Sequence, residues 1–278
     1  MQHVREAVGS RFDPALMQRA RERTWVALHG IRERMLPGIS EDEAKLVAAE
    51  VFRGLGVERL WHPPLIRIGA NTTRTYRQRS EPGVRLGEND SYFIDLGLVF
   101  DGHEGDVGDT FVVGQAPERL ACAQAARTLF DEVAHAWRTR HLSGAALYAF
   151  AGERAAAMGW RLNHAIKGHR LGDFPHAVHK GGDLGALDAT PTSGLWVLEI
   201  QIAHPTEPFG AFYEDLLTTD GDGLHGNGEP FPAQQRKRLL EGIARGEQAL
   251  HGGHTLSHAQ ARLCMARWLT ASPEDSHP

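Results

Sequence analysis

The chain opens with two stretches in which apolar residues recur at helical spacing. The first begins at Asp13-Pro14, where a proline suits the first turn of a helix, and it stops before Pro37-Gly38. The second follows Ser40, which stands three residues before Glu43 in the pattern of a capping box. The apolar positions of the two stretches are Leu28, Ile31, Met35, Val47, Val51 and Leu55. We therefore predict two helices at the start of the chain.

The pattern then changes to that of extended chain. Residues 64–68 and 91–100 are rich in strand-forming residues, and Asp101-Gly102 is a strong hairpin signal, so a partner strand is expected over 103–113. Helices are predicted over 117–138 and 143–158, a loop over 167–185, strands over 196–202 and 211–219, and helices over 232–250 and 257–269. Helices that flank an antiparallel sheet predict an α+β fold.

Two carboxylates lie on facing strands of the predicted hairpin. Asp95 and Asp106 are eleven residues apart around the turn, so their side chains are near neighbours across the ladder if a bulge adjusts the register. Two buried carboxylates side by side repel each other and are costly to desolvate. A divalent cation would make the pair favourable, whereas the alternative is that one aspartate faces solvent.

The second half of the chain carries a similar pattern. Glu199 lies in an otherwise apolar strand, Glu214 lies in the next strand, and His169 and His176 lie in the glycine-rich loop between the halves. Four carboxylates and one imidazole form an oxygen and nitrogen donor set that suits Mn, Fe, Co or Zn. Four carboxylates around one small cation would be overcharged, so two cations that share bridging carboxylates are expected.

The order Asp, Asp, His, Glu, Glu resembles the pita-bread metallopeptidase superfamily of methionine aminopeptidase, aminopeptidase P, prolidase and creatinase. The matching segments are 93–97, 101–106, 168–176, 198–200 and 213–218, together with 63–72 and 210–221. The resemblance covers about residues 13–221 and is strongest to the prolidase and aminopeptidase P branch, without its N-terminal domain. It implies a pita-bread fold, in which helices flank an antiparallel sheet with two pseudo-twofold halves.

The resemblance implies a role for each of the five ligands. Asp95 would chelate one divalent ion, Asp106 and Glu214 would bridge both ions, and His169 and Glu199 would complete the shell of the second. The expected cofactors are thus two ions of Mn, Co, Fe or Zn per chain.

The same resemblance implies how the reaction proceeds. A hydroxide bridging the two ions would attack a carbonyl carbon. Glu199 would handle the proton, and His176 would contact the substrate or the developing oxyanion.

The sequence departs from the family where the substrate binds. The proline-specific branch places a histidine after the Gly-x-Asn segment and an arginine near the final glutamate, and both are missing here. Tyr76 or Arg74 takes the place of the histidine, Tyr213 stands near that of the arginine, and His62 or His103 is able to supply the lost imidazole. Of these residues we predict that Tyr76, Tyr213 and His62 contact substrate, and that ordinary Xaa-Pro dipeptides and Met-peptides are turned over weakly.

Composition narrows the function classes. The formal net charge is -5, with 30 basic and 35 acidic residues and no basic stripe, so a nucleic-acid partner is not expected. The sequence contains no run of 18 apolar residues, so no membrane-spanning helix is expected. Two cysteines do not make a disulfide scaffold, so a cytoplasmic location is expected.

Three functions remain open. The leading one is a metal-dependent hydrolase of a C–N bond in a small peptide, most simply an Xaa-Pro-type aminopeptidase or dipeptidase. The second is a creatinase-like hydrolase of a small non-peptide amide or amidine, and the third is a metal-free binding module with the same fold. Residues 1–221 are predicted to form the catalytic domain and 222–278 a helical extension packed on it or on a second subunit of a homodimer.

Overall fold

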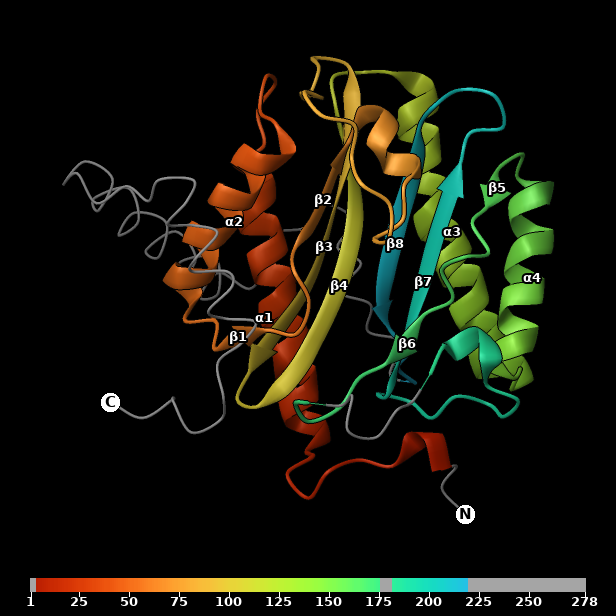
Figure 1. Ribbon diagram of the computed structural model, residues 1–278. Helices are drawn as coiled ribbons and strands as arrows, with labels where there is room; N and C mark the ends of the chain where they lie inside the picture. Colours follow the sequence, from red (N-terminus) through yellow and green to blue (C-terminus); the bar gives the residue numbers. More distant parts are fainter. Residues whose placement is uncertain (1–3, 176–181, 220–278) are drawn as a thin grey trace.

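The computed structural model describes residues 4–175 and 182–219 of the chain, and its centre is one antiparallel sheet (Figure 1). The strand order is β1-β3-β4-β8-β7-β5, with β2 paired to β3 and β6 paired to β7. The strands are β1 (Arg59–Leu60), β2 (Leu65–Ile68), β3 (Asp90–Phe100), β4 (His103–Val113), β5 (Arg161–Leu162), β6 (His169–Arg170), β7 (Trp196–Ala203) and β8 (Gly210–Leu216).

Two helices belong to each half of the described chain. They are α1 (Pro14–Arg32), α2 (Glu41–Leu55), α3 (Pro117–Arg140) and α4 (Gly144–Ala157), with short 3-10 turns η1 (Val4–Glu6), η2 (Gly69–Thr73) and η4 (Leu184–Ala186). The helix α2 begins with the predicted capping box, since Ser40 accepts from the Glu43 N–H while Glu43 caps the Ser40 backbone. The helix α1 ends at Arg32, so Met35 lies beyond it in the following turn.

The hairpin of β3 and β4 forms as predicted around Asp101-Gly102, both of which have a positive φ as this tight turn requires. Phe100 pairs with His103, and the register continues without a bulge along the ladder. The bulge that the sequence allowed for between the two aspartates is therefore absent from this ladder. The pairing places Asp95 opposite Gly108, and Asp106 opposite Gly97, with both side chains on one face of the sheet.

The two faces of the sheet differ in character. The helix α1 packs on β3 and β4, α3 packs on β7 and β8, and α2 and α4 lie against α1 and α3. The main hydrophobic core lies on that face and includes Ile94, Leu96 and Ile200. Because side chains alternate along a strand, Asp95 and Glu199 point to the opposite face, away from the helices. No helix among the described residues is long and apolar enough to cross a membrane.

Candidate metal centre

The acidic cluster begins on the β3–β4 hairpin, where glycines leave room for it. Asp106 is almost fully buried and Asp95 is 13% exposed in its side chain. Gly108 lies opposite Asp95 and also pairs with Glu214 of β8. A Cβ added to Gly108 would lie 2.9 Å from Glu214 Oε1, so the absence of a side chain there lets the two halves of the sheet meet.

The second half contributes two glutamates that face each other. Glu199 of β7 pairs with Glu214 of β8, and Glu214 is completely buried. Neither carboxylate oxygen of Glu214 has a hydrogen-bond partner among the described residues. Glu199 is held more firmly, because its Oε2 accepts from the Gly168 N–H at 3.1 Å. A buried carboxylate without a partner is unfavourable and indicates a group that is supplied from outside the chain.

His169, the first residue of β6, points its ring into this cluster. Its Nε2 lies 2.8 Å from Asp106 Oδ2 and 3.5 Å from Glu199 Oε1. Its Nδ1 lies 3.2 Å from the carbonyl oxygen of Arg170, which can only accept, so Nδ1 carries the hydrogen and Nε2 faces the carboxylates.

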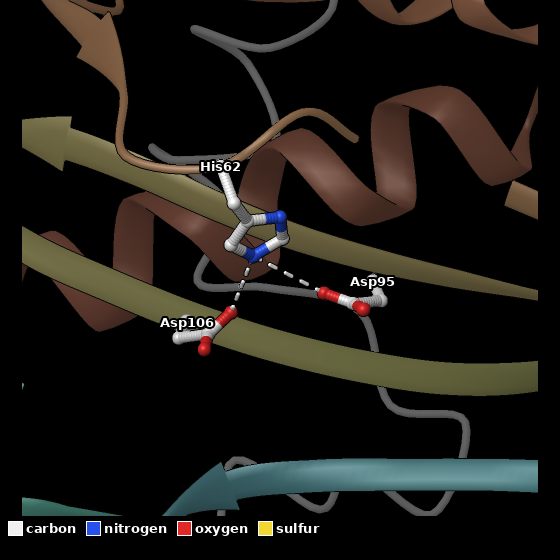
Figure 2. A group of neighbouring side chains, drawn as sticks. All are labelled: His62, Asp95 and Asp106. Carbon is white, nitrogen blue, oxygen red and sulfur yellow. Dashed lines mark hydrogen bonds and ion pairs between the residues drawn. The ribbon is translucent and has the colours of Figure 1, made fainter. Parts of the chain in front are cut away.

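His62 approaches the same cluster from the segment between β1 and β2 (Figure 2). Its Nε2 lies 3.3 Å from Asp106 Oδ1 and 3.4 Å from Asp95 Oδ1. The ring lies over Gly97, where an added Cβ would be 2.4 Å from Nε2. His62 thus contacts the acids themselves.

The ionisation of each acid in this cluster depends strongly on the charges of the others. Burial raises the pKa of Glu214 well above its ordinary value, and the charges of Asp106, Asp95 and Glu199 add to that effect. Burial also raises the pKa of Asp95 to about 7 and raises that of Glu199. These four acids therefore resist being ionised together.

The two imidazoles respond in the opposite direction. Burial opposes their protonation, but the neighbouring carboxylates raise the pKa of His62 to about 9 and that of His169 to about 10. Despite burial, contacts with both rings lower the pKa of Asp106. The chain thus provides internal positive charge at the place where a cation would sit.

The donor set fits divalent ions. Two groups of donors share Asp106, namely His62–Asp95–Asp106 and Asp106–His169–Glu214. Within each group, the three ligand atoms lie within 4.8 Å of one another. With metal–ligand bonds of about 2.0–2.2 Å, ligands of one shell lie about 3–3.5 Å apart, close to the separations seen here. Mixed carboxylate and imidazole donors suit Mn, Fe, Co or Zn.

A cleft of about 1030 Å³ opens over the cluster and gives a substrate access to it. Asp95, Asp106, His169 and Glu199 line its acidic part, and apolar side chains line the rest with several cations. The apolar lining residues are Leu46, Trp61, Pro63, Pro64, Leu65, Ala165 and Ile166, the cations are Lys45, Arg67, Arg77, Arg79 and Lys167, and Asp42 and Asp183 are further acids.

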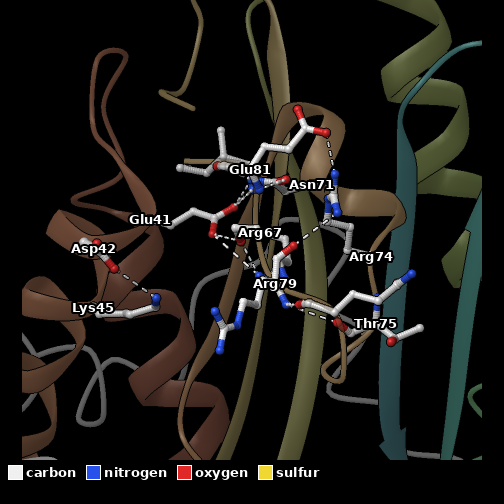
Figure 3. A network of polar contacts seen from close by, with 12 residues as sticks. Glu41, Asp42, Lys45, Arg67, Asn71, Arg74, Thr75, Arg79 and Glu81 are labelled. Atoms are coloured by element: carbon white, nitrogen blue, oxygen red, sulfur yellow. Dashed lines mark hydrogen bonds and ion pairs between the residues drawn. The ribbon is translucent and has the colours of Figure 1, made fainter. Parts of the chain in front are cut away.

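A polar network holds one wall of the cleft in place (Figure 3). Arg67 of β2 donates to the carbonyl oxygens of Thr75 and Gln78, which fixes the segment over 74–81 against the sheet. Glu41, the first residue of α2, accepts from Asn71 Nδ2 at 2.9 Å and from the Ile68 N–H at 3.0 Å. The wall is therefore tied to both the sheet and a helix.

The predicted substrate contacts divide into three groups. Tyr76 lies on the cleft wall and is 62% exposed, and His62 also lines the cleft. Tyr213 does not, so its prediction is wrong: it neighbours Glu214 on a strand and therefore faces the helices, where it packs on Trp25 and Phe130. His176 lies outside the described residues.

Sequence reasoning missed several residues that shape the centre. Trp61 lies edge-on to both imidazoles, with ring centroids 4.5 Å from His62 and 5.0 Å from His169. The Tyr148 hydroxyl of α4 donates to the Glu199 carbonyl oxygen at 3.0 Å and steadies β7 behind the site. A glycine two residues after Asp95 and another two after Asp106 were the one signal in the sequence for close packing at this point.

The comparisons with known proteins identify the family of the fold. The family model described as "Metallopeptidase family M24" matches residues 15–220. No curated protein matches the sequence significantly.

Solved structures of peptidases share the fold. The X-Pro aminopeptidase from Thermotoga maritima is 17% identical with a TM-score of 0.59, over 72% of this chain and 56% of that one. The prolidase from Pyrococcus horikoshii is 20% identical with a TM-score of 0.59, over 77% of this chain and 61% of that one. The methionine aminopeptidase from Thermotoga maritima is 15% identical with a TM-score of 0.58, over 74% of this chain and 94% of that one. The chain thus spans about three fifths of the first two proteins and nearly all of the third.

Proposed function

The chain belongs to metallopeptidase family M24, with its pita-bread fold, and from this premise we propose that it is a hydrolase of a C–N bond that uses two divalent metal ions. The proposed ligands are Asp95, Asp106, His169, Glu199 and Glu214. Mn, Co, Fe or Zn would suit this donor set. The substrate we propose is a small peptide, cleaved by an Xaa-Pro-type aminopeptidase or dipeptidase activity.

One observation carries the proposal. Glu214 is completely buried, and both of its carboxylate oxygens lack a hydrogen-bond partner among the described residues. It faces Glu199 directly, and Asp106 lies close enough to share a cation with it. A metal-free binding module would carry the cost of this buried group beneath an open cleft without any compensating ligand.

The residues around the centre would have different roles in the proposed hydrolysis. The bound ions would polarise the scissile carbonyl and activate the attacking water. Glu199 would take the proton from that water and pass it to the leaving nitrogen, because it lines the cleft while Glu214 is buried beneath it. Trp61 would exclude bulk water from one side of the centre, since it packs against both imidazoles.

The cleft also supports a peptide substrate. Sequence alone indicated that cations for holding a carboxylate were missing, but Arg77, Arg79 and Lys167 line the cleft together with the acidic cluster. Both acids and cations line the cleft, which suits a short peptide that carries a free amino group and a carboxylate. We therefore propose that these cations take the part of the missing arginine.

The metal-binding step is tested on Glu214→Gln, which keeps the shape and removes the charge. The variant without metal is expected to be at least as stable as the wild type, because a buried unpaired acid is gone. Added Mn²⁺ or Co²⁺ should raise the melting temperature of the wild type but have little effect on the variant. Elemental analysis should give up to two ions per wild-type chain. A wild-type chain that binds no ion and shows no thermal shift would refute the metallohydrolase.

Substrate class is tested by measuring kcat/KM in Mn²⁺ and Co²⁺ against Ala-Pro, Met-Ala-Ser and a panel of small amides. The peptides are expected to be turned over, but weakly, because the family's histidine after the Gly-x-Asn segment is missing. This activity is expected to be lost in Glu214→Gln and in Asp106→Asn. Turnover of the small amides alone would instead support a creatinase-like hydrolase.

A further inference from the structure

We propose that His62 is a sixth protein ligand of the metal centre, which binds through Nε2 to the same ion as Asp95 and Asp106. The inference rests on the proposed function, because it assigns a residue to a centre whose other ligands are proposed above. It changes the part predicted for His62 from the sequence, which was contact with substrate.

The hydrogen bond at the other ring nitrogen sets the orientation of His62. Its Nδ1 lies 2.8 Å from the Pro63 carbonyl oxygen, and a carbonyl oxygen only accepts, so Nδ1 carries a hydrogen. In a neutral imidazole Nε2 is then the nitrogen with the free lone pair. A hydrogen bond from Nδ1 to a backbone carbonyl is the usual partner of a histidine that binds metal through Nε2.

The direction of Nε2 points to a cation between the ring and the acids. Nε2 lies 3.3 Å from Asp106 Oδ1 and 3.4 Å from Asp95 Oδ1, so it is nearly equidistant from two carboxylates on different strands. Two ligands at tetrahedral angles, with bonds of about 2.0–2.1 Å, are separated by about 3.3–3.4 Å. Both carboxylate oxygens are thus at the spacing from Nε2 of neighbours in one coordination shell, and all three donor atoms lie within 4.8 Å of one another.

His62 also reproduces the local arrangement of His169. Each ring binds the carbonyl oxygen of the next residue through Nδ1, and each directs Nε2 at Asp106, one at Oδ1 and the other at Oδ2. Trp61 packs edge-on against both rings. Each half of the sheet thus supplies one imidazole and two carboxylates, and each ion would have a histidine of its own.

The strand beneath His62 is shaped for this position. Gly97 lies opposite Asp106, and a Cβ at Gly97 would be 2.2 Å from Cδ2 and 2.4 Å from Nε2 of His62. Only a glycine permits the ring to lie flat over the strand and reach the acids.

The test uses the full chain loaded with Co²⁺ and read by proton NMR in water. An imidazole that binds Co²⁺ through Nε2 keeps its Nδ1 proton, which gives a strongly shifted signal that disappears in D₂O. His62→Ala and His169→Ala are each expected to remove one such signal. His135→Ala, which changes an exposed histidine of α3, should remove none.

Calorimetric titration with Co²⁺ gives a second readout that does not depend on turnover. His62→Ala should weaken one of the two sites by at least the roughly 10- to 100-fold that loss of a supporting partner costs a metal site. If His62→Ala binds two ions with wild-type affinity and retains every shifted signal, the sixth ligand is refuted and the proposed hydrolase stands. A wild-type chain that binds no Co²⁺ refutes both.

Gly97→Ala is a second variant that leaves all six donors in the chain. Its methyl group would lie 2.2 Å from the His62 ring and 2.5 Å from Trp61 Nε1, so it would displace both side chains and is expected to shift or remove the His62 signal. Circular dichroism of the metal-free variant checks its folding. An unchanged spectrum in both Gly97→Ala and His62→Ala would overturn the assignment.

Discussion

At the scale of single residues, an ionisable group can be buried in its charged form only where neighbouring groups compensate that charge. Glu214 and His29 illustrate two outcomes on opposite faces of the sheet. Glu214 lies among like charges and is an acid whose ionised form burial disfavours, an arrangement that the proposed cation would compensate. His29 lies in α1 beside Trp25 and Phe111, and burial favours the neutral form of its imidazole.

His29 therefore predicts a dependence of stability on pH. Burial, aided by the charges of Arg32 and Arg127, lowers the pKa of His29 from 6.5 to about 4. Because the folded pKa is the lower one, its contribution is complete above pH 6.5 and is lost as the pH falls towards 4. We expect the metal-free chain to lose up to about 3 kcal/mol of unfolding free energy over that window through this residue.

Urea unfolding of the metal-free wild type and of His29→Leu at pH 4.5 and pH 7 measures this effect. The variant should lose less stability on acidification than the wild type, whereas the exposed control His135→Leu should behave as the wild type does. Equal losses in all three chains would show that His29 titrates normally in the folded state.

At the scale of elements, one buried ion pair docks the first helix on the last described strand. Arg21 of α1 donates through Nε and Nη2 to the two carboxylate oxygens of Asp215, at 2.5 and 2.6 Å. Both side chains are almost completely buried, and the Trp25 indole donates to the same carboxylate at 3.2 Å. A bidentate pair of this kind joins segments that are 194 residues apart in the sequence.

We predict that Arg21→Met destabilises the chain by roughly 3–5 kcal/mol, because it leaves Asp215 buried without its cation. The double variant Arg21→Met/Asp215→Leu should recover much of that loss, since no charge then remains unpaired. Arg19→Met, at an exposed position of the same helix, should change stability by less than about 0.5 kcal/mol. Denaturant titrations of the three variants decide the matter, and a loss in Arg21→Met no greater than that in Arg19→Met would contradict it.

At the scale of the whole molecule, the extension predicted over 222–278 lies outside the described residues. Its sequence carries an apolar stripe at helical spacing, formed by Phe231, Leu239, Leu240, Ile243 and Leu250. Such a stripe needs a surface to cover, either on residues 1–221 or on a second copy of the chain.

Truncation after Gly221 is therefore expected to lower the melting temperature or to change the oligomeric state. Calorimetry and light scattering of the full and truncated chains measure the two outcomes. Substitution of Leu239 and Leu240 by serine in the full chain should have the same effect, while serine at Gln234 and Glu241, on the opposite face of the predicted helix, should not. A truncated chain with unchanged stability, mass and activity would remove the proposed packing role of this segment.

Local signals in the sequence determined most of the elements and the identity of the proposed ligands. The capping box at Ser40 and the turn at Asp101-Gly102 depend on a few adjacent residues, so both are legible without a structure. Glu199 and Glu214 likewise stand out in the sequence as acids within two predicted strands. Their order along the chain is the signal that led to the family.

Only the tertiary structure decided which side chains meet. Asp106 and Glu214 are brought together by the pairing of Gly108 with Glu214, at a contact between halves that no local pattern encodes. Tyr213 was misplaced because its neighbour Glu214, not itself, takes the site face of β8. His62 reaches the acids only because Gly97 has no side chain on the strand beneath it. Local preference acts within a few residues, whereas the geometry of a metal centre depends on contacts between strands far apart in the sequence.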